Sequence, residues 1–342
     1  MQKKLRLSAL VVLVLFALLV VPIMRYRKEA NLTSLPSRFI KGVVASAVDP
    51  TKMSADRETI CRAANELALQ FVILSPDGNI GESFSDAASW CKNTLIIESP
   101  AKIADIDLVN LYDSLRKVSR FSRVIHVSRY LFNSSYALLS AIDHPRDSLS
   151  QWDLNCRTGR KTGVFSLGTE GGLSLPGVTK STLPSFRSMF EILTVYVRID
   201  RELVKEPGKS MEMVMNAVKA GHFFNAIEAI AAANGFDARF YPVESADVIQ
   251  MGDMDPRFQG KLQVDTPFTF PTRVMLIRNG EKVATAPSSS RGRSVWDIAN
   301  PGIYRVEVYV PGNHFANLPW IVTNPFYLGT ANHLANRPSG SE

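Results

Sequence analysis

Residues 39–74 decide the fold class, because two apolar runs there enclose a segment with helical spacing. FIKGVVASA occupies 39–47 and QFVIL occupies 70–74. Between them, ADRETICRAANELAL at 55–69 places five apolar side chains on one helical face, namely Ile60, Ala63, Ala64, Leu67 and Leu69. A continuous apolar run such as QFVIL is typical of a parallel strand that is buried on both faces. The stretch therefore predicts a strand–helix–strand unit of an α/β protein.

The same alternation continues to about residue 167, and helical patterns follow it. We expect further strands at 94–97 and 122–127, and helices at 83–92, 105–118, 184–206 and 210–219. Another apolar run, YALLSAI at 136–142, has the character of a strand and ends just before His144. Alternating strands and helices predict an α/β layer or barrel over residues 39–235.

Beyond residue 236 the pattern changes to short alternating strands separated by Gly, Pro, Asn and Asp. Strands are expected within 238–243, 247–252, 260–265, 273–286 and 302–310. Asn279-Gly280 suits a type I′ turn between two of them. This spacing predicts a β-sandwich over 236–330, followed by a small, polar tail at 331–342 that we expect to be disordered.

The N-terminus has the pattern of a membrane anchor. An uncharged, mostly apolar run from Leu7 to Met24 lies between two groups of basic residues. Eighteen residues at about 1.5 Å each nearly match a bilayer core of about 30 Å. Basic residues occupy the stretch where a signal peptidase site would lie, which favours an uncleaved signal anchor over 1–28 with a linker at 29–38. We expect a single-pass protein whose body lies outside the cytoplasm, in the periplasm if the cell has two membranes.

Charge and cysteine content narrow the class further. Of the net charge of +7, residues 1–30 contribute +5, so the body is nearly neutral and nucleic acid is not an expected partner. The three cysteines, Cys61, Cys91 and Cys156, form no CxxC motif. Buried free thiols are the favoured interpretation, and a Cys61–Cys91 bridge is the alternative in an oxidising compartment.

Local motifs for catalysis are absent from the sequence. There is no GxSxG, no Walker loop and no HxH, HxxxH or HExxH pair among the five histidines. His144 is the best single candidate, because it follows a strand-like run and the ends of strands are where α/β barrels place their chemistry.

Several segments together resemble the PHP (polymerase and histidinol phosphatase) family of metal-dependent phosphoesterases. In the first half they are KGVVASA, ELALQFVILSPDGN, LIIE, AIDHPRDSLSQWD, SLGTEGG and LPGVTKSTLPSFRSMF. In the second half, GKLQV, IRNGEKV, PGIYRVEVYV and PWIVTNPFYLG are similar to the sandwich of a membrane-associated branch of that family. The resemblance spans about residues 38–330. It implies a distorted (β/α)7 barrel with two or three metal ions at its strand ends, followed by a β-sandwich.

The resemblance also implies that most metal ligands are lost. The positions that match family ligands carry Ala45, Ala47, Pro76, Thr169 and Gly171. Glu98 matches a bridging carboxylate, Asp77 falls on the last position of the family's Thr-Asp-His, and His144 matches a His-Pro ligand more loosely. These three residues are too few for a trinuclear cluster and would hold at most one cation weakly.

Three functions are compatible with these residues. The first is a degenerate, non-catalytic PHP-like pseudoenzyme without a cofactor, which binds a phosphorylated or glycan ligand or an envelope protein. The second is an active manganese- or zinc-dependent phosphoesterase with a rebuilt site, in which Asp49, Asp77, Glu98, His126, His144 and Glu170 converge. The third is a structural or assembly protein that exposes sandwich aromatics, with Trp296, Tyr304, Tyr309 and Trp320 as candidates. Burial of these aromatics in the core is the competing expectation.

Overall fold

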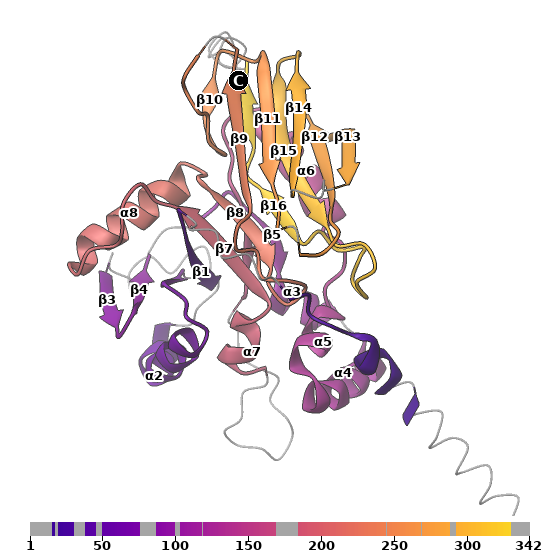
Figure 1. Ribbon diagram of the computed structural model, residues 1–342. Helices are drawn as coiled ribbons and strands as arrows, with labels where there is room; N and C mark the ends of the chain where they lie inside the picture. The colour runs from indigo at the N-terminus through magenta and orange to yellow at the C-terminus, as the bar shows by residue number, and fades with distance from the viewer. Residues whose placement is uncertain are drawn as a thin grey trace, which may run out of the picture.

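The computed structural model describes residues 16–17, 20–30, 38–45, 50–75, 87–99, 103–117, 119–168, 184–243, 245–267, 269–287 and 292–329. They form a mixed α/β protein built around one large sheet (Figure 1). The α/β class expected from residues 39–74 is therefore confirmed.

The large sheet has twelve strands in the order β10-β17-β15-β16-β8-β7-β1-β2-β4-β3, with β12 and β13 added beside β15. Its strands are β1 (Phe39–Ala45), β2 (Phe71–Leu74), β3 (Ala87–Cys91), β4 (Thr94–Glu98), β7 (Leu193–Arg198), β8 (Phe223–Ile227), β10 (Met254–Asp255), β12 (Arg273–Arg278), β13 (Glu281–Pro287), β15 (Gly302–Tyr309), β16 (Ile321–Thr323) and β17 (Phe326–Leu328). Only β1, β2 and β4 form the predicted parallel set, and β7 and β8 join antiparallel. No barrel closure appears among the described strands, so the sheet there is open.

Helices cover both faces of the sheet around β1. Side chains alternate along a strand, so Val43 faces α2 (Pro50–Glu66) and α7 (Phe186–Phe190), while Val44 faces α8 (Pro207–Lys219). Burial on both faces explains why β1 and β2 are almost continuously apolar. The remaining helices are α3 (Leu111–Lys117), α4 (Arg120–Phe132), α5 (Ser134–Leu139) and α6 (Arg146–Cys156). A separate parallel pair is formed by β5 (Ile106–Asn110) and β6 (Gly163–Ser166).

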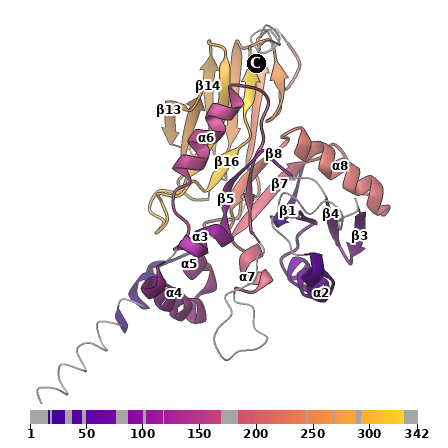
Figure 2. The ribbon, with the colours of Figure 1, turned by 180° about the vertical axis from the view of Figure 1, so that it is seen from behind.

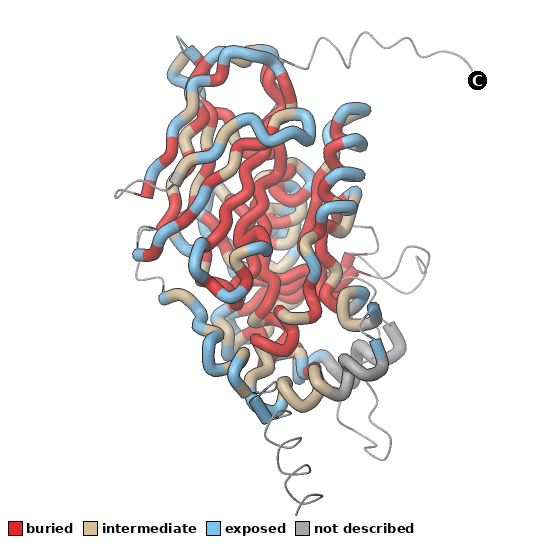
Figure 3. The backbone as a smooth tube through the Cα atoms, turned by 90° about the vertical axis from the view of Figure 1, so that its right-hand side faces the viewer, coloured by how far each residue is buried: buried red, intermediate tan, exposed pale blue. Residues whose placement is uncertain are grey.

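The C-terminal strands form two layers. A three-stranded sheet of β14 (Arg293–Ile298), β11 (Gly260–Asp265) and β9 (Asp237–Pro242) lies against β12 and β15 (Figure 1). Leu262 and Val264 of one layer share a hydrophobic cluster with Val306 and Val308 of the other. Figure 3 shows this buried interior continuing down into the α/β part. It continues because β16 pairs with β8, so the large sheet crosses the boundary expected at residues 235–236.

The hairpin between β12 and β13 turns at the predicted residues. Asn279 and Gly280 have φ values of 52° and 86°. A type I′ turn requires positive φ at both central positions, which Asn and Gly tolerate best. The prediction from the Asn-Gly pair is confirmed.

Several predicted elements are wrong. Residues 87–91, expected to be helical, form β3, which turns back on β4 through Lys92 with a φ of 56°. The helix expected at 105–118 begins only at Leu111, because 106–110 form β5 and the Asn110 side chain accepts from the Asp113 amide at its start. The strand expected at 122–127 is part of α4, which packs on α5.

Two further corrections concern residues 136–142 and 184–206. YALLSAI is not a strand: α5 begins after Asn133, whose side chain accepts from the Tyr136 amide at 2.8 Å. The long helix expected at 184–206 is instead α7 followed by β7, whose β-branched residues fill the space between β1 and β8. His144 therefore follows a helix rather than a strand.

Most of the N-terminal region lies outside the described residues, including eleven of the eighteen residues from Leu7 to Met24 and the linker residues 31–37. The tail at 331–342 also lies outside them. Among the residues that the structure describes, no helix is both long and apolar enough to cross a membrane.

Candidate functional site

The carboxyl ends of β1, β2 and β4 form the edge where the resemblance places a metal site. Ala45 pairs with Leu74, and Leu74 pairs with Glu98. Because the three strands are parallel neighbours, Ala45 and Glu98 lie at the same edge of the sheet. Ala45 is buried and offers only a methyl group there.

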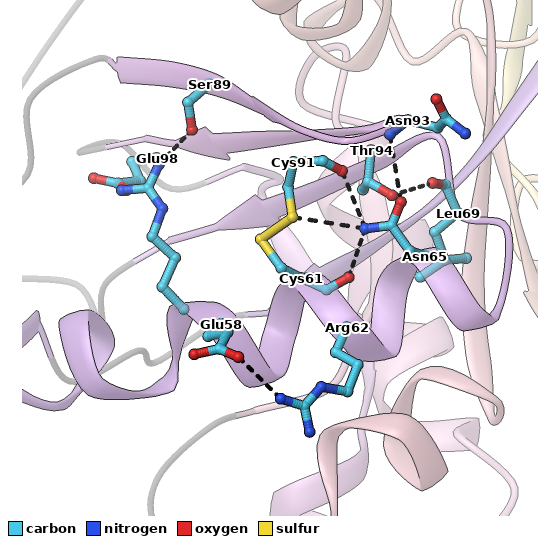
Figure 4. The surroundings of a disulfide bond; sticks show 11 residues. Glu58, Cys61, Arg62, Asn65, Leu69, Ser89, Cys91, Asn93, Thr94 and Glu98 are labelled. Carbon is cyan, nitrogen blue, oxygen red and sulfur yellow. Dashed lines mark hydrogen bonds and ion pairs between the residues drawn. A yellow bond between two sulfur atoms is a disulfide. The ribbon is translucent and has the colours of Figure 1, made fainter.

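Glu98 is already paired with a cation of the chain. Its Oε1 lies 3.3 Å from Nη1 of Arg57, and the same guanidinium donates to the Ser89 hydroxyl (Figure 4). A guanidinium beside a carboxylate neutralises the charge that would attract a metal ion. Ala45 supplies no donor and Glu98 faces Arg57, so these two described residues do not offer a pair of free metal ligands at this edge.

His144 lies in a different environment. Its Nε2 is 3.1 Å from the Tyr309 hydroxyl, and that hydroxyl donates to Oε2 of Glu307 at 2.6 Å. Burial lowers the pKa of His144 from its ordinary value, against the raising effect of Glu307. The partners of His144 are on β15, whereas those of Glu98 are on α2 and β3, so these two candidate ligands share no neighbour.

The other residues of the rebuilt-site hypothesis add little. His126 contacts the hydroxyl of Ser140 at 3.1 Å through Nδ1, and its pKa is lowered mainly by burial. Within the described ranges, no three His, Cys, Asp or Glu side chains are grouped so that they could hold a metal ion. Several positions lie outside those ranges, namely Ala47, Asp49, Pro76, Asp77, Thr169, Glu170 and Gly171.

The sandwich aromatics are mostly core residues. Tyr304, Tyr309 and Trp320 are buried, and Trp320 also donates its indole N–H to the Ala231 carbonyl at 2.8 Å. Trp296 is half-buried. The competing expectation of core packing is therefore confirmed for three of the four.

The structure contains a polar groove at the opposite end of the sheet. Because β7 is antiparallel to β1, the last residue of β7 lies beside the first residue of β1: Arg198 pairs with Phe39. The groove has a volume of about 480 Å³, within the range of small-molecule sites. It is lined by β7 and the loop after it, by α8 and by two residues further along the chain: Arg198, Ile199, Asp200, Arg201, Met213, Asn216, Ala217, Ala220, His222 and Gln250.

Arg198 is the unusual residue of this groove. It is only 8% exposed, and its Nη1 is buried and makes no hydrogen bond to any described residue. Its nearest partner is Asp237, with Nη1 and Oδ1 3.5 Å apart, and it lies over the Phe39 ring at 5.8 Å. Burial lowers the pKa of Arg198, against the effect of Asp237. A guanidinium stays charged and carries five donors, and the donors on Nη1 have only the long contact to Asp237.

The surroundings of Arg198 explain why Asp237 does not satisfy it fully. Asp237 also forms an ion pair with Arg239, so one carboxylate serves two guanidinium groups. Burial raises the pKa of Asp237, while both arginines lower it. Arg201 adds a further cation at the groove, and Asp200 is the acidic residue lining it. The lining side chains therefore include two arginines and one aspartate.

Asp253 positions two lining residues, His222 and Gln250, on another side of the groove. One of its oxygens contacts Nε2 of His222 at 2.7 Å, and the other accepts from the backbone amide of Gln250 at 2.8 Å. The Gln250 side-chain oxygen is buried and accepts no hydrogen bond from the described residues. The groove thus combines a cation with an unused acceptor, which together suit an anion that carries hydroxyl groups.

Sequence reasoning missed this site. Arg198, Arg201, His222 and Gln250 form no motif, and they come together only because β7 reverses direction beside β1. A cysteine pairing that the sequence left open is also settled: Cys61 and Cys91 form a disulfide between α2 and β3, and Cys156 is a buried free thiol (Figure 4). The favoured expectation of free thiols is wrong for the first two and correct for the third.

No protein-family model matches the chain, and no curated protein is significantly similar to it.

Proposed function

We propose that this chain is a membrane-anchored, non-catalytic binding protein that takes a phosphorylated saccharide in the groove beside Arg198. The observation that carries the proposal is the buried guanidinium of Arg198, whose Nη1 makes no hydrogen bond to the described residues and only a long ion pair with Asp237. Burying a charge without full pairing is costly, and a bound anion would remove that cost. The volume of about 480 Å³ suits a monosaccharide phosphate, whose hydroxyl groups would donate to Gln250.

The non-catalytic part of the proposal rests on the opposite edge of the sheet. The Arg57 guanidinium forms an ion pair with the Glu98 carboxylate. Ala45 stands where the family resemblance implies a histidine. We therefore regard the chain as an opened, degenerate relative of the PHP barrel with a C-terminal sandwich. On this proposal the carboxyl ends of β1, β2 and β4 no longer carry a metal site, and the ligand binds at the end of β7 instead.

The location outside the cytoplasm has two supports. The apolar run from Leu7 to Met24 has the length of a signal anchor. The Cys61–Cys91 disulfide is typical of proteins in an oxidising compartment.

The test is calorimetric titration of the full chain in detergent with glucose 1-phosphate, glucose and inorganic phosphate. We expect the sugar phosphate to bind more tightly than either fragment. Arg198→Gln should weaken binding by about tenfold or more, since a charge-assisted bond contributes at least ~1.4 kcal/mol. Arg198→Lys keeps the charge but loses the planar fork and should give an intermediate loss. Arg62→Gln, at an exposed ion pair on α2, is the matched control.

Two results would overturn the proposal. Equal affinity of the wild type and Arg198→Gln would exclude the groove as the site. Metal-dependent release of phosphate from the sugar phosphate, abolished by Glu98→Ala or His144→Ala, would establish an enzyme instead.

A further inference from the structure

Three of the most exposed large apolar side chains belong to two neighbouring segments. Met24 is 80% exposed, and Leu131 and Phe132 at the end of α4 are 75% and 66% exposed. Figures 1 and 2 show α4 beside the segment that leads out of the N-terminal helix, in views from opposite sides. Single exposed apolar residues are ordinary, but a group at one place marks an interaction surface.

The chain just after the predicted bilayer segment is fixed to the body at this place. Tyr26 packs on the rings of Tyr136 and Phe315, each with a centroid distance of 5.8 Å, and its hydroxyl donates to the Ala229 carbonyl at 2.7 Å. The Glu29 amide donates to the Ile230 carbonyl at 2.9 Å. The body is therefore held close to the point where the anchor would leave the bilayer.

The rest of α4 is fixed to the protein, which leaves its end free to face outward. The Tyr130 hydroxyl bonds Ser188 and accepts from the Ser185 amide at 3.1 Å. The Arg129 guanidinium lies over the Tyr136 ring at 5.5 Å. Leu131 and Phe132 directly precede Asn133, the capping residue of α5, so their position relative to Tyr136 is set by rigid elements.

The charge of the same two segments indicates the kind of surface that they meet. In sequence, residues 20–30 and α4 carry six Lys or Arg residues and one acidic residue, Glu29. Elsewhere the body is nearly neutral. Basic residues next to exposed Leu and Phe are the combination that binds the interface of an anionic bilayer.

We propose that the end of α4, with Leu131 and Phe132, inserts into the headgroup region of the bilayer that holds the N-terminal anchor, against anionic phospholipid. The occupant is lipid rather than a protein partner, because Tyr26 fixes this surface beside the end of the predicted spanning segment. The inference rests on the anchoring part of the proposed function and is independent of the groove. Insertion of Leu131 and Phe132 would hold the body on the membrane in one orientation, whereas a body joined only through a flexible linker would adopt many.

The experiment uses the full chain with Leu131→Cys, labelled with an environment-sensitive fluorophore and reconstituted in vesicles of phosphatidylcholine and phosphatidylglycerol. Labelling is selective, because Cys61 and Cys91 are paired and Cys156 is buried. Leu154→Cys, on α6 and 51% exposed, is the matched control. If position 131 reaches ~5–10 Å into the interface, lipid that is brominated near its headgroup should quench roughly half of the fluorescence of the label there. The label at 154 should keep its emission.

The outcomes separate the two proposals. Flotation with the vesicles tests the anchor alone. A protein that floats, with the label at 131 unquenched, overturns this inference and leaves the anchor standing, whereas a protein that does not float overturns both. Quenching at 131 that does not weaken in vesicles of phosphatidylcholine alone overturns the role of anionic lipid. Quenching at 131 but not at 154, weaker without phosphatidylglycerol, supports the proposal.

Discussion

Arg305 of β15 and Asp153 of α6 form a two-point ion pair in the protein interior, with Nε–Oδ1 and Nη2–Oδ2 distances both of 2.8 Å. Arg305 also pairs with Glu307 on its own strand. Both charges of the α6–β15 pair are more than nine-tenths buried. This pair joins the sandwich to a helix that lies 152 residues earlier in the chain.

Replacing Arg305 should be strongly destabilising. Arg305→Met leaves Asp153 and Glu307 buried without their cation, and breaking a buried pair costs about 3–5 kcal/mol. Urea unfolding followed by circular dichroism would measure this. Arg293→Met removes an exposed ion pair to Asp265 and should cost less than about 1 kcal/mol. Equal losses of unfolding free energy for Arg305→Met and Arg293→Met would contradict the stabilising role of the buried Arg305–Asp153 pair.

Acidification should destabilise the protein through its histidines. The folded state lowers the pKa of both His126 and His144, mainly by burial. The unfolded chain therefore binds more protons than the folded one as the pH falls below the ordinary histidine value of about 6.5. Stability should fall across that window, with full stability above it. His144→Gln keeps a hydrogen-bonding side chain near Tyr309 but does not titrate. Melting temperatures from pH 7.5 to 5 should show a shallower slope for this variant, and an unchanged slope would exclude His144 as a contributor.

The cysteines should differ sharply in reactivity. Burial raises the pKa of the Cys156 thiol to about 12, and this thiol lies 3.4 Å from the Tyr327 hydroxyl. Because the thiolate is the reacting form, native protein should take up no iodoacetamide within minutes at pH 8. Intact-mass analysis should show one adduct after denaturation and three after denaturation with reductant. Native labelling at Cys156, or three adducts without reductant, would refute the arrangement.

The groove depends on the close approach of Gly252 to Ala220 and Gly221. Gly252 has a φ of 88°, and a Cβ built on it would lie 2.0 Å from the Ala220 carbonyl oxygen. Gly252→Ala should push the segment that carries Gln250 away from the end of α8. We expect a loss of about 1–3 kcal/mol in stability and weaker binding of glucose 1-phosphate. Gly208→Ala, in α8 where a Cβ meets nothing within 4 Å, is the control and should leave binding unchanged without lowering stability. Unchanged binding by a folded Gly252→Ala protein would show that this contact does not shape the site.

What the sequence predicts well is what depends on local pattern. The apolar run at 70–74, the helix at 210–219 and the Asn279-Gly280 turn are recognisable because burial and turn chemistry act on neighbouring residues. The strand expected at 122–127 failed because its β-branched residues are placed in α4 by packing on α5, which the local pattern does not contain. The groove was missed for a related reason: strand direction decides that Arg198 lies beside Phe39, and nothing near either residue indicates an antiparallel partner.

The pairing of β16 with β8 has a consequence for how the chain reaches its final state. One edge of β8 is completed only by residues 321–323, about a hundred residues later. During synthesis, the α/β half therefore exposes an unpaired strand edge until residues 321–323 have been made. Contacts of such long sequence separation fold slowly. A chain that cannot close its sheet early leaves that strand edge open to pairing with other chains until β16 arrives.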